Sequence, residues 1–152
     1  DAREVWRHDA SGVTVTAVAV HHEPVPEAVA YRVDSPAGSV VISGDTRVCR
    51  EVEDLSRGAD LLVHEACRAT AMRDAIAGTV FEKIFSYHAD TVSLGASAER
   101  AGVPHLVLTH LIPSPADETE EQGFVDDVRA GGYGGRVTVG RDLMTFQVSN
   151  NV

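Results

Sequence analysis

The sequence predicts an α/β fold built on a mixed β-sheet. Near its start, residues 13–20 alternate between apolar and small polar side chains, a period of two that is typical of a strand with one buried face. Farther along, short apolar runs at 60–63 and 105–109 are separated by segments with helical patterns. Strands that alternate with helices in this way are typical of a parallel sheet with helical crossovers.

The antiparallel part of the sheet is expected first. After the strand at 13–20, a Pro-rich corner leads to a second strand at 28–33, and the turn Ser35-Pro-Ala-Gly38 leads into a third strand at 39–43. Pro and Gly favour tight turns because their backbone angles fit them. The opening of the chain is therefore predicted to be a small antiparallel meander.

The crossover part follows. Its helical patterns cover about 48–57, 66–86 and 91–101. A last helix at about 117–130 leads through a glycine-rich stretch to two apolar segments at 136–139 and 143–148, which we expect to be closing strands. The acidic start of this last helix is interpreted as a solvated N-terminus.

Composition restricts the classes of function. The chain has 152 residues, of which 43% are hydrophobic, and this is enough for one domain with a core. Its formal net charge of −10 argues against a protein that grips nucleic acid through broad phosphate neutralisation. No apolar run approaches the roughly 20 residues of a bilayer span. We therefore expect a cytoplasmic protein without membrane contact.

Polar residues with metal or proton chemistry follow three of the predicted strands. Asp45 comes after the strand at 39–43, His64 and Glu65 come after the next one, and His110 comes after the strand at 105–109. The carboxyl ends of parallel strands lie along one edge of a sheet, and ligands bind in the crevice there. We expect these side chains to converge.

The types of donor limit what such a cluster can do. Carboxylate oxygen and imidazole nitrogen are the ligands that Zn²⁺ takes, and a carboxylate can bridge two ions. Asp45 and His110 are therefore candidate metal ligands. A catalytic zinc needs about three protein ligands, so the metal site within this chain is expected to be incomplete.

Four motifs carry a family resemblance. They are Ser43-Gly-Asp-Thr46, His64-Glu-Ala66, His88-Ala-Asp90 and Thr109-His-Leu111. In order and spacing they resemble the last motifs of the ribonuclease Z-like branch of the metallo-β-lactamase superfamily, over most of residues 28–148. The superfamily's HxHxDH motif occurs nowhere in the chain, so we expect it in an N-terminal half that precedes Asp1.

The resemblance implies a role for each residue. Asp45 would bridge two zinc ions, and His110 would complete the second metal site. His64 and Glu65 correspond to the family's HEAT box, in which the Glu hydrogen-bonds a later His that protonates the leaving group. That His would be His88. A carboxylate behind an imidazole fixes its tautomer and raises its basicity. His22, near a Pro-rich corner, is a candidate substrate-binding residue.

The expected activity is hydrolysis of a phosphodiester by a zinc-bound water, with RNA or a small ester as substrate. The chain departs from the family where His-Ala-Asp replaces His-Ser-Thr and where Cys67 replaces a Thr. Two alternatives therefore stay open. One is an arylsulfatase-like or other ester hydrolase, and the other is a non-catalytic α/β interaction module.

The resemblance also predicts the assembly. It implies one half of a four-layer αββα sandwich, with helices on one face of a mixed sheet and an apolar opposite face. Exposing such a face costs on the order of 25 cal/mol per Å². We expect it to be covered by the N-terminal half or by a second copy of the chain in a symmetric dimer. The isolated chain is expected to be nearly inactive.

Overall fold

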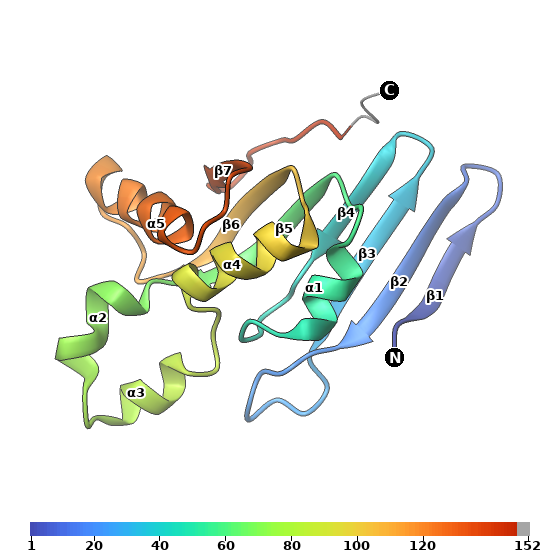
Figure 1. Cartoon of the computed structure of the whole chain (residues 1–152). Helices are drawn as coiled ribbons and strands as arrows, with labels where there is room; N and C mark the ends of the chain where they lie inside the picture. The colour runs from blue at the N-terminus through green and yellow to red at the C-terminus, as the bar shows by residue number, and fades with distance from the viewer. Residues whose placement is uncertain (149–152) are drawn as a thin grey trace.

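A computed structural model of the chain describes residues 1–148, which form a seven-stranded mixed sheet with helices on one face (Figure 1). The strands in these residues are β1 (Arg3–His8), β2 (Val13–Ala19), β3 (Val29–Ser35), β4 (Gly38–Ile42), β5 (Leu61–Cys67), β6 (His105–Ile112) and β7 (Arg136–Val139). The helices are α1 (Arg50–Ser56), α2 (Ala69–Ile76), α3 (Val80–Phe85), α4 (Thr91–Ala101) and α5 (Glu118–Ala130). None of these helices has the length and hydropathy of a membrane span.

The order of the strands in the sheet follows the order in the chain. Strands β1 to β4 pair antiparallel, whereas β4, β5, β6 and β7 pair parallel. The predicted meander and the predicted parallel part are both confirmed. The helices expected at 48–57, 91–101 and 117–130 are also present as α1, α4 and α5.

The hydrophobic core lies between the sheet and the helices α1, α4 and α5. Val41 of β4 and Leu106 of β6 are fully buried there, together with Leu94 of α4 and Val128 of α5. Side chains of a strand alternate between the two faces of the sheet. The residues next to Val41 therefore point to the other face.

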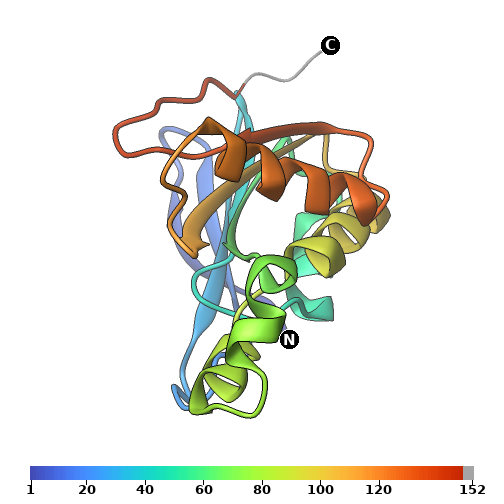
Figure 2. The same ribbon diagram turned by 90° about the vertical axis from the view of Figure 1, so that its left-hand side faces the viewer.

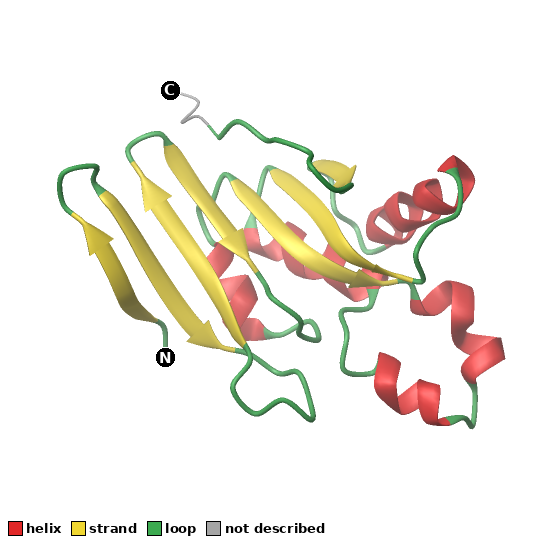
Figure 3. Ribbon diagram, turned by 180° about the vertical axis from the view of Figure 1, so that it is seen from behind, coloured by secondary structure: helices red, strands yellow, loops and turns green. Residues whose placement is uncertain are grey.

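That other face carries two apolar rows across the antiparallel strands. One row pairs Val15 with Val33 and Val33 with Val40, and the next pairs Ala17 with Tyr31 and Tyr31 with Ile42. Residues directly opposite one another share a face. Figure 3 shows this side of the sheet with no helix in front of it. These six residues are called the open sheet face below.

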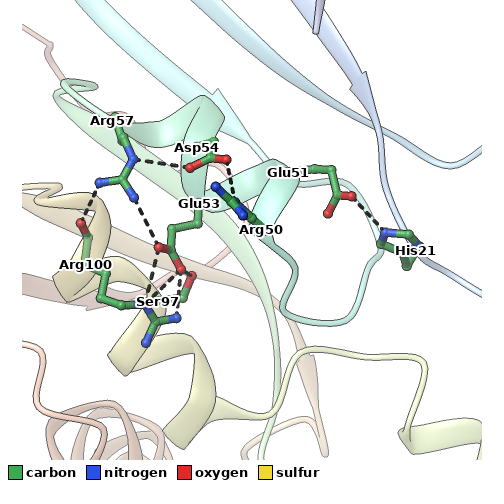
Figure 4. Close-up of polar contacts among 8 residues, drawn as sticks. All are labelled: His21, Arg50, Glu51, Glu53, Asp54, Arg57, Ser97 and Arg100. Atoms are coloured by element: carbon green, nitrogen blue, oxygen red, sulfur yellow. Dashed lines mark hydrogen bonds and ion pairs between the residues drawn. The ribbon is translucent and has the colours of Figure 1, made fainter. Parts of the chain in front are cut away.

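Polar contacts tie α1 to α4 and to the end of β2. Glu53 of α1 accepts hydrogen bonds from Arg100 at 2.8 Å and from Ser97 at 3.0 Å, both on α4 (Figure 4). The Arg100 hydrogen bond is the main reason that the pKa of Glu53 is lowered. His21 Nε2 lies 3.2 Å from Glu51 Oε1. Together these contacts hold the segment before His22 against the helical layer.

The helical stretch expected at about 66–86 starts later than predicted and is divided. Strand β5 continues to Cys67, and two short helices follow instead. Gly78 has a φ of 73°, a left-handed angle that ends a helix at little cost only for glycine. Thr79 then starts α3, and its side-chain oxygen accepts a hydrogen bond from the Phe81 N–H.

Helices α2 and α3 form an arm, residues 69–86, that projects from the body of the molecule. Neither helix has a buried residue. Figure 2 shows the arm extending away from α4 and α5. Packing of an apolar face normally supplies most of a helix's stability, so the arm contributes little to the core.

Two further differences concern the ends of the chain. The strand expected at 143–148 is absent, because Leu143 has a φ of 66° and is fully exposed, which is incompatible with a strand. An unexpected strand, β1, pairs along β2 and has only exposed residues. The sequence of β1 does not show the alternation of apolar and polar residues that is typical of a strand, because charged residues and a register shift between Glu4 and Trp6 interrupt it.

Candidate active site

Asp45 and His110 lie together at the carboxyl edge of the parallel strands. Asp45 follows β4, and its Oδ2 atom lies 3.7 Å from the Nε2 atom of His110 in β6. The pairing of β5 with β6 shifts register between Glu65 and Ala66, beside His110, whose φ is 44°. Such bulges re-aim side chains, and a left-handed φ is uncommon outside glycine. The backbone is thus shaped to point this imidazole at the edge.

Gly44 makes the approach of Asp45 possible. Its φ is 61°, and a Cβ at this position would lie 2.7 Å from the Val29 carbonyl oxygen. Only glycine fits a backbone this close with a left-handed φ. The turn from β4 to Asp45 therefore requires glycine at position 44.

Glu65 is a fully buried carboxylate held by three donors. Its Oε1 atom accepts a hydrogen bond from the Thr46 N–H at 2.8 Å and lies 2.9 Å from His88 Nδ1. Its Oε2 atom accepts from the Ala89 N–H at 3.2 Å. Burial raises the pKa of Glu65 to about 7, and the N–H groups of Ala89 and Thr46 act in the opposite direction. The carboxylate is therefore fixed in position, with its oxygens already engaged.

His88 lies at the centre of three imidazoles. Its ring centroid is 5.0 Å from that of His22 and 5.3 Å from that of His110. His22 Nδ1 lies 3.3 Å from the Tyr87 carbonyl oxygen. The pKa of His88 is lowered, first by burial and then by the charges of His22 and His110. Because Nδ1 of His88 faces Glu65, Nε2 is the ring nitrogen that remains available for proton transfer.

His64 does not join this cluster. It follows the core residue Leu62 by two positions, so it shares the side of β5 opposite to Glu65. The ring is 2% exposed, and its Nδ1 lies 2.8 Å from the carbonyl oxygen of Glu65. Burial lowers the pKa of His64 to about 4. The contact supports the backbone of Glu65, and a catalytic role for His64 stays a prediction.

Two groups of donors could hold a metal ion. Among residues 1–148, the ligand atoms of His22, Glu65 and His88 lie within 4.8 Å of one another, but both oxygens of Glu65 already accept hydrogen bonds. Asp45 and His110 have side chains about half exposed, and their nitrogen and oxygen donors fit zinc. The second pair therefore fits a metal better, with ligands still to be added.

Sequence reasoning missed the groups that support these residues. Thr46 and Ala89 act through their backbone N–H groups, which no side-chain pattern indicates. The one available signal was that Thr46 belongs to the Ser43–Thr46 motif around Asp45.

Comparison with known proteins identifies the family of the chain. Residues 1–111 match the family model described as Beta-lactamase superfamily domain. Ribonuclease Z of Mycobacterium tuberculosis is 36% identical over 147 residues, which cover 97% of this chain and 52% of that protein. Ribonuclease Z of Mycobacterium marinum is 33% identical over 144 residues, which cover 95% of this chain and 50% of that protein. The chain spans about half the length of these curated relatives.

Solved structures show the same fold. The metallo-β-lactamase fold protein YhfI from Bacillus subtilis aligns with a TM-score of 0.68 at 21% identity, covering 91% of this chain and 50% of that one. The short form of human tRNase Z aligns with a TM-score of 0.64 at 20% identity, covering 97% of this chain and 46% of that one. The chain has the metallo-β-lactamase fold over about half of each neighbour's length, and it belongs to the β-lactamase superfamily.

Proposed function

We propose that this chain forms one side of the active site of a zinc-dependent phosphodiesterase of the ribonuclease Z type. The observation that carries the proposal is the 2.9 Å contact between His88 Nδ1 and Glu65 Oε1, placed beside the pair of Asp45 and His110. A proton-transfer group next to candidate metal ligands is the arrangement that hydrolysis of a phosphodiester requires.

Each residue has a distinct task in this proposal. Asp45 and His110 would hold zinc, which when bound supplies a Lewis acid and an activated water. Glu65 accepts the Nδ1–H of His88, which leaves Nε2 to face the leaving oxygen. In its imidazolium form His88 also carries a proton on Nε2, and when the ester bond breaks this proton passes to the leaving oxygen and His88 becomes the neutral Nδ1–H form. Burial of both groups keeps bulk water from competing for that hydrogen bond. His22, edge-on to His88, would contact the substrate.

The remaining ligands would come from a second half-domain that carries the HxHxDH motif. The open sheet face is where that half would pack, because Tyr31 and Ile42 are more than 40% exposed on it and exposed apolar faces of this kind mark interaction surfaces. The chain together with this half is called the complete enzyme below. A second copy of the chain is the alternative occupant of the same face.

RNA is the substrate that the curated relatives suggest, since they are named ribonuclease Z. The net charge of −10 means that this chain would make local phosphate contacts rather than a broad basic grip. Any wider contact with RNA would come from the second half-domain.

The test compares Asp45→Ala with Asp9→Ala in the complete enzyme. Asp9 lies in the exposed turn between β1 and β2, so its loss should leave zinc content and hydrolysis unchanged. Asp45→Ala should lose zinc, measured by metal analysis, and should reduce hydrolysis of bis(p-nitrophenyl) phosphate and of a 3′-extended RNA to background. Faster hydrolysis of an aryl sulfate than of either phosphodiester would favour the arylsulfatase-like alternative. If the wild type contained no zinc and hydrolysed none of these substrates, the non-catalytic interaction module would be the alternative that remains.

A further inference from the structure

A buried carboxylate outside the cluster connects the two segments that carry Glu65 and His88. Asp127 on α5 is 9% exposed. Its Oδ2 atom accepts hydrogen bonds from the Thr91 hydroxyl at 3.0 Å, from Arg68 Nε at 3.3 Å and from the Thr70 hydroxyl. A single oxygen atom thus gathers three donors from three places in the chain.

The three donors sit directly beside the catalytic motifs. Arg68 follows the last residue of β5, three positions after Glu65, and Thr70 lies in the first turn of α2. Thr91 is the first residue of α4, three positions after His88, and it is fully buried. Asp127 therefore joins the end of the Glu65 segment to the end of the His88 segment.

The chain between these segments cannot fix their separation. Twenty-three positions separate Glu65 from His88, and most of them belong to the arm, whose helices have no buried residue. The Cys67 N–H donates to the Ala89 carbonyl at 2.6 Å, which aligns the two backbones at one point. The Ala89 N–H also donates to Glu65 Oε2 at 3.2 Å, so both of these ties lie close to the cluster itself. Asp127 adds a tie farther along both segments, at Arg68 and Thr91.

Helix α5, which carries Asp127, packs closely against α4. A Cβ at Gly95 of α4 would lie 2.1 Å from the Val128 carbonyl oxygen, and a Cβ at Gly131 would lie 2.1 Å from the Val92 carbonyl oxygen. The backbones of α4 and α5 are therefore in direct contact. Close packing of this kind transmits rather than absorbs displacement.

Gly123 completes a socket for Arg68. It lies one turn before Asp127 on α5, and a Cβ there would be 2.2 Å from the guanidinium carbon of Arg68. A side chain at this position would displace the guanidinium from the carboxylate. The lack of a side chain at Gly123 and the carboxylate of Asp127 thus both fix the position of the Arg68 guanidinium.

We propose that Asp127 is a positioning residue that sets the geometry of the Glu65–His88 hydrogen bond from helix α5. It touches neither substrate nor metal. The inference rests on the proposed function for its catalytic consequence, whereas its structural part, control of the His88 ring, can be tested without any activity.

The first test uses the chain itself and reads the tautomer of His88. Nitrogen shifts of the ring, observed by NMR through its carbon-bound protons, distinguish a proton on Nδ1 from one on Nε2. We expect the Nδ1–H form in the wild type and a mixture of forms in Asp127→Asn. Asp126→Asn, on the neighbouring exposed position of α5, is the matched control and should leave the shifts unchanged. Unchanged His88 shifts in folded Asp127→Asn would overturn the proposal.

A second pair of variants covers the case in which Asp127→Asn does not fold. Thr91→Val removes the hydroxyl at nearly constant volume, whereas Thr91→Ser retains it. The tautomer should become mixed in Thr91→Val and should return to the wild-type form in Thr91→Ser. A merely structural role would leave both variants with the wild-type tautomer, whatever their melting temperatures.

The third measurement separates positioning from binding in the complete enzyme. Misplacement of a catalytic group by about 1 Å can cost roughly 10²-fold in rate, so Asp127→Asn should lower kcat by tenfold or more while KM and zinc content stay unchanged. An equal loss of zinc would show that Asp127 supports the metal site instead. If the wild type shows the expected His88 tautomer but no hydrolysis, the proposed function fails and the positioning role remains.

Discussion

The imidazole rings of His88 and His110 lie stacked, with centroids 5.3 Å apart and planes inclined by 16°. Each ring has its own carboxylate: Glu65 at 2.9 Å from His88 and Asp45 at 3.7 Å from His110. The first carboxylate is buried and the second is half exposed. Two imidazoles in contact therefore have separate environments, one suited to proton transfer and the other to a metal.

The first prediction concerns His88. Changing His88 to Ala in the complete enzyme should reduce phosphodiester hydrolysis by about 10²–10⁴-fold, the contribution typical of a general acid, while zinc content stays near the wild-type value. His105→Ala is the control, because His105 lies at the start of β6 and contacts Thr138 through its ring. Loss of zinc in His88→Ala would make His88 a ligand.

The second prediction concerns the pH dependence of stability. The pKa of His64 falls from 6.5 to about 4 on folding, so the unfolded chain binds an extra proton between these values, and the free energy of unfolding decreases as pH falls through this range. The pKa of Glu65 rises from 4.5 to about 7, so the folded chain binds the extra proton there, and the free energy of unfolding increases as pH falls. The two effects oppose each other in the wild type.

Single variants should reveal each effect. As the pH falls from roughly 6.5 to 5, the free energy of unfolding of His64→Gln should rise by about 2 kcal/mol relative to that of the wild type. Glu65→Gln should show the reverse trend, losing stability relative to the wild type as the solution is acidified. Denaturant unfolding at the two pH values measures both. Parallel pH profiles for all three proteins would show that His64 is not buried in its neutral form.

The third prediction tests the contact between α4 and α5. Gly95→Ala would place a Cβ 2.1 Å from a backbone oxygen, and backbone must move to relieve it. Overpacking of this kind costs about 1–3 kcal/mol or more. Gly134→Ala is the control, because its Cβ would meet only Glu99 Oε2 at 3.8 Å. Chemical denaturation should show a clear loss for the first variant and almost none for the second.

The fourth prediction concerns the open sheet face. Light scattering at micromolar concentration should show the purified chain as a dimer or bound to a co-purifying partner, rather than as a monodisperse species of 16.2 kDa. Replacing Tyr31 and Ile42 with Lys should abolish that association, because buried unpaired charges are costly. Val80→Lys changes a still more exposed apolar residue on the arm and should leave the association intact. A stable wild-type monomer would exclude both proposed occupants of the face.

Sequence reasoning predicted the fold best where an apolar run leads into a chemically distinctive residue. Short apolar runs followed by Asp45, Glu65 and His110 located three strands, and the structure brings these side chains together with His88. Strands β5 and β6 continue beyond their predicted ends, so Glu65 and His110 lie within them. The break of the helix at Gly78 and the loss of the last strand at Leu143 were not predictable, because each depends on a local φ that the surrounding pattern conceals.

The groups that support the site were harder to predict than the site itself. Asp127 lies in the same helix as the acidic stretch that was interpreted as a solvated N-terminus, and its partner Arg68 is 59 positions away. Pairings between such distant residues leave no periodic signal. The same holds for the backbone N–H of Thr46, whose partner becomes known only when β4 lies beside β5.

The arm between β5 and α4 is free to vary over most of its surface. None of its helical residues is needed to fill the core, and within its two helices Thr70 is the residue that contacts Asp127, so the remainder of α2 and α3 can change without removing a core residue or that contact. Val80, Phe81 and Ile84 on α3 are all exposed and can be exchanged as a module. Proteins with this architecture could then differ in the exposed surface of the arm while the pair of Glu65 and His88 stays the same, and exchange of α3 between them should cost little stability.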